Sequence, residues 1–136
     1  RQHQTKVPGV FYLIIAVFFA GLWVNGDVIA HGWKAPKDAA AMKNAVPPDK
    51  DSIDSGKELY TQFCGVCHGQ NAQGDSRENA GTQTDPPDLR KRLKSHSDGD
   101  FFWKIQNGNT DMPSFEEDLQ ENDIWSVINY LRTLIE

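Results

Sequence analysis

The chain has 136 residues, with 14 Lys and Arg against 19 Asp and Glu and a formal net charge of -5. This length suits one small domain with appended segments, and it excludes a dinucleotide-binding domain paired with a substrate domain, a barrel enzyme or a multidomain synthetase. The acidic balance argues against general nucleic-acid binding, so we expect no nucleic-acid partner. Cys64 and Cys67 are too close in sequence to form a long-range disulfide framework, and their role must be local.

An apolar run near the N-terminus predicts a membrane anchor, assigned to residues 1–26. Residues 7–26 hold no charged side chain, and as a helix they span about 30 Å, the thickness of a bilayer core. Arg1 and Lys6 precede the run, so the positive-inside rule places the N-terminus in the cytoplasm and the rest of the chain outside. A cleaved signal peptide, cut near residues 28–30, is the alternative, although the run is longer than a usual signal core. Whether a further anchor precedes Arg1 stays open.

Residues 27–51 are predicted to form a linker, because Gly, Ala, Lys and Pro dominate their composition. Twenty-five extended residues reach about 80 Å, so the anchor alone does not fix the place of the following domain. A short helix is weakly indicated within residues 37–43.

Residues 52–136 are predicted to form an all-α domain with three helices and no strand. The first helix is expected to begin at residues 52–55, where Ser55 and Glu58 can form a capping box. Three short helices bury little apolar surface, so something else should fill the centre of the domain.

The second and third helices have clearer end signals. The second is expected over residues 98–107, with Ser97 near its start and Gly108 as its stop. The third is expected over residues 123–134, with Asn122 as a candidate N-cap. Its apolar residues recur at helical spacing on one face: Ile124, Val127, Ile128, Leu131 and Leu134.

The sequence Cys64-Gly-Val-Cys67-His68 is a C-x-x-C-H motif, which is typical of c-type haem attachment. Two thiols at this spacing reach the two vinyl groups of one porphyrin edge, and the adjacent imidazole becomes an axial ligand of the iron. A thioredoxin-like redox pair needs a βαβ context, and a zinc site needs a second pair of Cys or His at suitable spacing. We therefore predict one covalent haem c, which also fills the centre of the domain.

Met112 is the favoured second axial ligand. It precedes Pro113 in the loop between the second and third helices, where a thioether can approach the iron from the face opposite His68. His/Met ligation raises the reduction potential and suits an electron carrier. One alternative is that Met112 is an ordinary core residue. The other ligand candidates are His96, in a polar loop that we expect to be exposed, His31 and Met42 in the linker, and His3 near the N-terminus.

Several further motifs accompany C-x-x-C-H: Gly56-Lys-Glu-Leu-Tyr60, Pro86-Pro-Asp-Leu89, Asn107-Gly108, Met112-Pro113 and Trp125-Ser-Val-Ile-Asn-Tyr-Leu131. Together they resemble the class I c-type cytochromes throughout residues 52–136. The resemblance implies that the first and last helices cross at Gly56 and Tyr130. It also implies that the Pro87 carbonyl accepts the ring N–H of His68 and that Leu89 packs on the haem face.

A narrower similarity concerns the lead-in to the domain. Residues 41–47 and 52–56 are similar to the monohaem cytochrome subunits of alternative complex III, the bacterial quinol:electron-acceptor oxidoreductase. This similarity implies that the partners are other subunits of a membrane electron-transport complex. It also implies a single-pass location in the bacterial cytoplasmic membrane, with the haem domain on the periplasmic side. Cytochromes of nitric oxide reductases, terminal oxidases or photosynthetic reaction centres share this plan, and a free-standing membrane-anchored shuttle stays open.

The expected function is one-electron transfer to or from a soluble or membrane-bound redox partner, with no catalytic site in this chain. A haem enzyme needs an open iron position and distal acid–base groups, whereas Met112 would close the site. A sensor needs an output module, for which the chain has no room.

Two charge clusters have open roles. The acidic residues within 116–123 can steer a basic partner or form a solvated face beside a helix N-terminus. The basic run of residues 90–94 can neutralise haem propionates, bind a neighbouring subunit or form an exposed turn.

Overall fold

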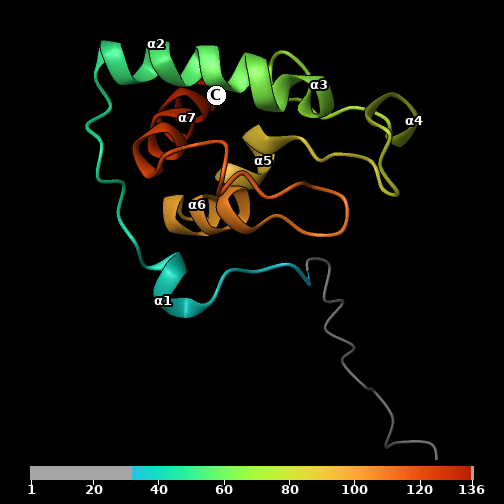
Figure 1. Ribbon diagram of the computed structural model, residues 1–136, viewed down its shortest axis with the longest axis horizontal. Helices are drawn as coiled ribbons and strands as arrows, with labels where there is room; N and C mark the ends of the chain where they lie inside the picture. Colours follow the sequence, from blue (N-terminus) through green and yellow to red (C-terminus); the bar gives the residue numbers. More distant parts are fainter. Residues whose placement is uncertain (1–31, 136) are drawn as a thin grey trace, which may run out of the picture. The chain divides into compact units, whose positions relative to one another are not determined.

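The described part of the chain is helical. The structure is a computed structural model that describes residues 32–135, and no β-strand occurs among these residues. The all-α prediction for the domain is therefore confirmed. In chain order the elements are α1 (Lys37–Ala40), α2 (Lys50–Leu59), the π-helical segment η1 (Tyr60–Cys64), α3 (Gly65–His68), α4 (Arg77–Ala80), α5 (Leu89–Leu93), α6 (Asp98–Asn107) and α7 (Glu121–Thr133) (Figure 1).

One continuous helical stretch leads to the C-x-x-C-H motif. α2 begins at Lys50 because the Asp49 side chain accepts the backbone N–H of Ser52 at 2.9 Å and so caps the helix. The predicted capping box of Ser55 and Glu58 is wrong, since both residues lie inside α2. From Leu59 the stretch continues through η1 and α3, and the motif lies at its C-terminal end.

α2 and α7 cross in close contact (Figure 1). Gly56 of α2 lies against the α7 backbone at this crossing. A Cβ atom on Gly56 would overlap the backbone carbonyl of Ser126, so only glycine lets the two backbones approach this closely. One turn further along, the rings of Tyr60 and Tyr130 pack with their centroids 5.5 Å apart. The crossing implied by the cytochrome resemblance is therefore present, with Gly56 against Ser126 and Tyr130 against Tyr60.

α7 supplies the centre of the hydrophobic core. Four of the five apolar residues predicted for its buried face are at most 2% exposed: Ile124, Val127, Ile128 and Leu131. From α6, the Phe102 ring stacks on the Trp125 ring with a centroid distance of 4.2 Å. The long helices thus form a single apolar centre.

The end signals were correct for α6 and partly wrong for α7. The Ser97 side chain accepts the N–H of Asp100, and Gly108 ends α6 with a φ of +64°, so the predicted bounds are confirmed. α7 begins at Glu121 rather than residue 123, because the N–H of Gln120 donates to the Asp123 carboxylate at 3.0 Å. The predicted N-cap at Asn122 is therefore wrong.

Residues 33–49, which we call the strap, pack against the helical domain. Composition assigns residues 27–51 to a linker, but the chain from residue 33 onward belongs to the same compact unit as the helices. α1 lies within the strap, where a short helix is weakly indicated. The Lys104 ammonium lies 5.4 Å from the centre of a Trp33 ring, a cation–π contact between α6 and the strap.

A buried asparagine on α7 holds the middle of the strap. Asn129 is 5% exposed, and its side-chain amide donates to the backbone carbonyls of Val46 and Pro47 at 3.1 and 3.2 Å. Its side-chain oxygen accepts a hydrogen bond from Asn44 at 2.8 Å. Because these partners come from residues more than 80 positions away, helical periodicity does not indicate them.

A buried carboxylate on α6 holds the start of the strap. The Asp100 side chain is 7% exposed and accepts hydrogen bonds from the backbone N–H of Ala35 at 2.9 Å and from Lys104 at 2.6 Å. Burial alone would raise the pKa of Asp100. The Lys104 ammonium, the Ala35 N–H and His96 together hold the pKa below its ordinary value of 3.8. The carboxylate is therefore ionised near neutral pH.

The predicted transmembrane segment, residues 7–26, lies outside the described residues, as does the signal-peptide alternative at residues 28–30. Within residues 32–135, every helix is too short or too polar to cross a bilayer. Both interpretations of the N-terminal run stay predictions.

Replacing Asp100 by Asn should loosen the strap. The variant removes the charge that faces the mostly buried Lys104 ammonium, and losing one partner of such a pair costs about 3 kcal/mol of unfolding free energy. Because the pKa of Asp100 is lower in the folded than in the unfolded chain, its stabilisation is complete above about pH 4 and is lost as the pH falls through the folded pKa. Amide hydrogen exchange of the strap should therefore be faster in the variant at pH 7, and the difference should shrink below about pH 4.

The matched control is Asp54→Asn, which removes one negative charge from an exposed position on α2. Its strap exchange should equal that of the wild type. An equal acceleration in both variants would show that net charge, rather than the Asp100 contacts, holds the strap.

Candidate haem site

The C-x-x-C-H motif spans the change from π-helix to α-helix. Cys64 is the last residue of η1, whereas Cys67 and His68 end α3. π turns often occur at functional sites because they rotate the following side chains relative to a regular helix. Gly69, with a φ of +75°, stops the helix directly after His68. The two thiols and the imidazole are therefore presented together at one helix end.

His68 has a buried ring nitrogen with no hydrogen-bond partner. Among the buried side-chain nitrogen and oxygen atoms of the described residues, only His68 Nδ1 lacks a hydrogen-bond partner. Burial lowers the pKa of His68, and the backbone carbonyl of Pro87 opposes only part of this effect. The imidazole is therefore neutral at neutral pH and keeps a lone pair that can bind a metal. The contact with Pro87 falls short of hydrogen-bond geometry, so the bond implied for Pro87 stays a prediction.

The two cysteines differ in their surroundings. Cys64 is 8% exposed, and burial, together with the neighbouring Cys67, raises the pKa of its thiol to about 12. Cys67 is half-buried, and its thiol donates weakly to the carbonyl of Ala80 at 3.8 Å. A protonated, buried thiol is a poor nucleophile. This environment fits attachment points in a core better than a reactive redox pair.

The chain after His68 folds back toward the prolines that precede α5. The Tyr60 hydroxyl donates to the Gly69 carbonyl at 2.6 Å, and burial raises the pKa of Tyr60 well above its ordinary value, so the hydroxyl keeps its proton. The N–H of Gly74 donates to the carbonyl of His68 at 3.0 Å. Gly74 has a φ of +86°, and a side chain there would overlap the carbonyl of Pro86. This close approach brings the proline pair to the segment that follows His68.

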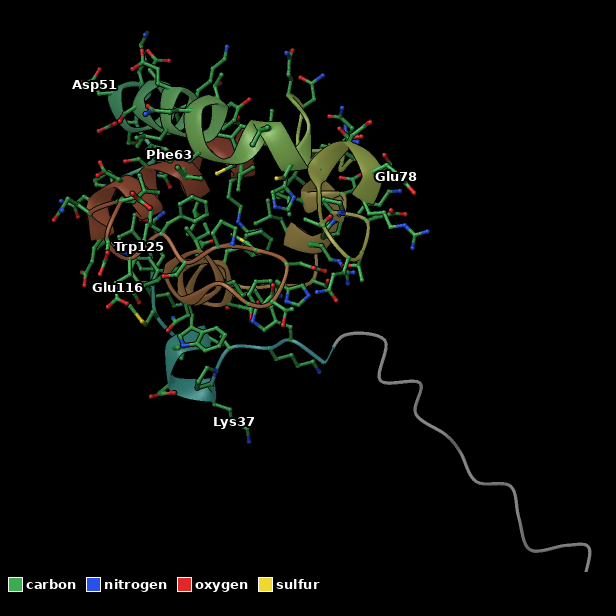
Figure 2. All side chains as sticks on the ribbon, turned by 45° about the vertical axis from the view of Figure 1, so that its right-hand side comes forward. Lys37, Asp51, Phe63, Glu78, Glu116 and Trp125 are labelled. Carbon is green, nitrogen blue, oxygen red and sulfur yellow. The ribbon has the colours of Figure 1, made fainter. Side chains whose placement is uncertain are left out.

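Met112 lies in a tight turn between α6 and α7. The Asn109 side-chain oxygen accepts the N–H of Met112 at 2.8 Å, and the N–H of Asn109 donates to the Met112 carbonyl at 2.8 Å. Further along the loop, the Phe115 ring packs edge-on against Phe63, with a centroid distance of 6.1 Å. Phe63, labelled in Figure 2, directly precedes the first cysteine of the motif. The Met112 loop is therefore in contact with the helix that carries the motif.

Asp111 joins the Met112 turn to the loop that precedes the prolines. One carboxylate oxygen accepts the N–H of Gln83 at 3.0 Å, and the other accepts the N–H and the hydroxyl of Thr84 at 3.2 and 2.7 Å. The Thr84 hydroxyl and these N–H groups hold the pKa of Asp111 below its ordinary value. Residues 83–84 lead within three positions to Pro87, which interacts with His68.

The observed environment fits a covalent haem. Two thiols and a neutral imidazole lie at one helix end, and the imidazole keeps one lone pair that can bind an iron atom. Leu89 and Met112 are partly buried and pack against the core. The ligand role of Met112 and the haem contact of Leu89 stay predictions.

The other candidate ligands are differently placed. Met42 is 42% exposed on the strap, and His31 and His3 lie outside the described residues. The expectation that His96 lies in an exposed polar loop is wrong. Its side chain is only 14% exposed, and its Nδ1 lies 2.7 Å from the Asp100 carboxylate.

The two charge clusters lie largely at the surface. Residues 116–118 are exposed, and Figure 2 shows Glu116 at the edge of the molecule. Glu121 and Asp123 lie in the first turn of α7, where negative charge stabilises a helix N-terminus. In the basic run, Arg90 forms an ion pair with Asp88 at 2.9 Å. These contacts leave the proposed partner roles of both clusters open.

Sequence analysis missed the contact between Asp111 and Thr84. The cluster Gly108-Asn-Thr-Asp111 is rich in turn-forming residues and could have indicated the Met112 turn. Thr84, however, lies 27 positions away in a polar loop, and no local pattern marks it as the partner.

Comparison with known proteins gives one family match and two similar proteins. Residues 51–131 match the family described as cytochrome c oxidase, cbb3-type, subunit III. Cytochrome c550 of Pseudomonas aeruginosa is 24% identical over 138 residues, which cover 85% of this chain and 88% of that protein. Methionine–tRNA ligase of Thermobifida fusca is 28% identical over 115 residues, which cover 81% of this chain and only 17% of that protein.

A solved structure also shares the fold. The reducing HAO-like protein complex Kustc0457/Kustc0458 of Kuenenia stuttgartiensis matches with a TM-score of 0.56 and 22% identity, covering 70% of this chain and 50% of that chain. The family match covers more than half of the chain and includes the whole C-x-x-C-H motif. The chain therefore belongs to the family of cytochrome c oxidase, cbb3-type, subunit III, and it is an electron-transferring c-type cytochrome with covalently bound haem c.

Proposed function

We propose that this chain is a membrane-tethered one-electron carrier with His68 and Met112 as iron ligands, working as a subunit of a larger electron-transport complex. The observation that carries the electron-transfer role is the neutral imidazole of His68, which lies beside the two motif thiols at the end of the motif helix. Bound haem supplies one-electron chemistry at its iron. The proposal assigns no separate catalytic site to the chain.

Met112 is the proposed second ligand because hydrogen bonds hold its turn, whereas His96 is paired with Asp100 and Met42 is exposed on the strap. The Met112 turn is held by Asn109, and its loop contacts the motif helix through Phe115. A thioether ligand raises the reduction potential relative to harder ligands, which suits a carrier on the oxidising side of a membrane. His96 is paired with Asp100 and is a poor competitor.

The protein's part in electron transfer is to hold the ligands still. His68 is fixed by the end of a continuous helical stretch, and its carbonyl accepts the N–H of Gly74. Met112 is held by two hydrogen bonds with Asn109: its N–H donates to the Asn109 side-chain oxygen, and its carbonyl accepts the Asn109 N–H. Cys64 and Cys67 prevent dissociation of the cofactor. Ligands held in this way rearrange little between oxidation states.

The proposed tether is the uncharged run of residues 7–26, and the preceding Arg1 and Lys6 support an inside N-terminus. The cytochrome domain then lies on the periplasmic side of a bacterial cytoplasmic membrane. Attachment to a membrane would confine its encounters to partners at that surface.

Alternative complex III is the first candidate for the whole assembly, supported by the similarity of residues 41–47 and 52–56 to its monohaem subunits. A terminal oxidase is the second candidate, because the matched family is described as an oxidase subunit. A solved cytochrome-fold neighbour from a protein complex supports a role among other subunits in either case.

Replacing Met112 by Ala should lower the reduction potential and open the iron to carbon monoxide. The thioether stabilises ferrous iron, so its loss should shift the midpoint downward by on the order of 100 mV. A redox titration measures the shift, and a difference spectrum after addition of carbon monoxide measures the open position.

Met42→Ala is the matched control, because Met42 is the other methionine of the chain and is exposed on the strap. It should leave both the potential and the spectrum unchanged. If Met42→Ala opens the iron and Met112→Ala does not, the ligand assignment is wrong.

The place of the chain in a complex can be tested on source membranes solubilised in mild detergent. A native gel stained for haem, followed by mass spectrometry of the band containing this chain, should show a large assembly with multihaem and iron–sulfur subunits. Co-migration with a copper-haem oxidase, a nitric oxide reductase or a reaction centre would reassign the complex. A lone band near the mass of the chain would indicate a free-standing shuttle, and recovery in the fraction released without detergent would contradict the tether.

A further inference from the structure

Asp111 and Thr84 connect two loops that are far apart in sequence, and we call their contact, with the N–H of Gln83, the clamp. Both carboxylate oxygens of Asp111 are engaged, at 3.0 Å with Gln83 and at 3.2 and 2.7 Å with Thr84. Hydrogen bonds to an ionised carboxylate are stronger than those between neutral groups. The three hydrogen bonds to the Asp111 carboxylate therefore favour one fixed distance between the two loops.

On one side, hydrogen bonds within the turn link the clamp to Met112. The Asn109 side-chain oxygen accepts the N–H groups of both Asp111 and Met112 at 2.8 Å. Gly108, where the turn begins, has a φ of +64°, and a side chain there would lie 2.5 Å from the Met112 carbonyl. Because these contacts leave the turn little freedom, a movement of Asp111 would carry Met112 with it.

On the other side, the clamp is linked to the segment that follows His68. The Thr82 hydroxyl donates to the carbonyl of Thr84 at 2.7 Å, which tightens this loop. Two positions beyond Thr84, the carbonyl of Pro86 accepts the N–H of Asp75 at 3.3 Å. The next residue is Pro87, whose carbonyl interacts with His68. The clamp thus joins the Met112 turn to the loop that leads to Pro87, which interacts with the other proposed iron ligand, His68.

We propose that Asp111, through the clamp, is a positioning residue for Met112 and limits how often the Met112 sulfur leaves the iron. The inference rests on the proposed His68/Met112 ligation. An added ligand such as imidazole can bind only after the bond from iron to sulfur has broken, and a bond from iron to nitrogen then forms with no transfer of electrons. The clamp should therefore control the rate of imidazole binding.

The test uses the ferric holoprotein and stopped-flow mixing with excess imidazole. Asp111→Asn removes the charge and places an amide donor among three donor groups, so we expect imidazole to bind about tenfold faster than in the wild type. Thr84→Val removes only the hydroxyl, and we expect an increase of about threefold. The double variant should resemble Asp111→Asn, because both substitutions disrupt the same contact.

Two variants control for charge and for shape. Asp118→Asn removes one exposed negative charge from the same loop without touching the clamp, and it should bind imidazole at the wild-type rate. Thr84→Ser keeps the hydroxyl and should also behave like the wild type. Equal acceleration by Asp118→Asn and Asp111→Asn would attribute the effect to charge and would overturn the proposal.

Denaturant unfolding of the same variants separates positioning from general stability. If the clamp only stabilises the whole fold, the clamp variants will have a lower unfolding free energy than the wild type but an unchanged rate of imidazole binding, and this result would overturn the proposal. Met112→Ala provides the reference for an open iron. If Met112→Ala binds imidazole no faster than the wild type, both the ligand assignment and the clamp are wrong; if it binds faster and the clamp variants do not, only the clamp is wrong.

Discussion

The close contact between α2 and α7 at Gly56 sets the geometry on which the site depends. Because no side chain lies between Gly56 and the backbone of Ser126, direct backbone contact fixes the distance between α2 and α7. α2 continues through η1 to His68, so the contact also gives the motif a fixed direction relative to the core. Tyr60, one turn beyond the crossing, packs on Tyr130 and donates to the chain just after the motif. A larger residue at position 56 would therefore displace the motif as well as the helices.

The helices around the motif are too short to be stable by themselves. α3, α4 and α5 have four or five residues each, well below the length at which an isolated helix forms in water. They are held in place by packing against neighbouring segments and against the longer helices. A covalently attached haem would supply apolar surface that these short helices lack, which connects the stability of this domain to its loading.

Local signals predicted the parts of the fold that depend on neighbours in sequence. The end signals at Ser97 and Gly108 gave the bounds of α6, and the spacing of the two cysteines and His68 identified the cofactor. Contacts that join distant segments were not predictable, because their partners carry no local pattern. Asn129 with the strap and Asp111 with Thr84 are of this kind. His96 shows a different limit, because its polar neighbours suggested exposure whereas Asp100, only four positions away, holds it partly buried.

The strap changes the reach of the cytochrome domain. If residues 7–26 are anchored as proposed, only residues 27–32 lie between the anchor and the packed unit, instead of the full stretch of residues 27–51. Six extended residues reach about 20 Å, a quarter of the span that the whole stretch would allow. Such a short linker raises the effective concentration of the domain at a neighbouring docking surface and limits the number of partners that the domain can reach. Under the proposed anchoring, Asp100 and Asn129 would therefore influence how far an electron can be carried from the membrane, although they belong to the packing of the fold.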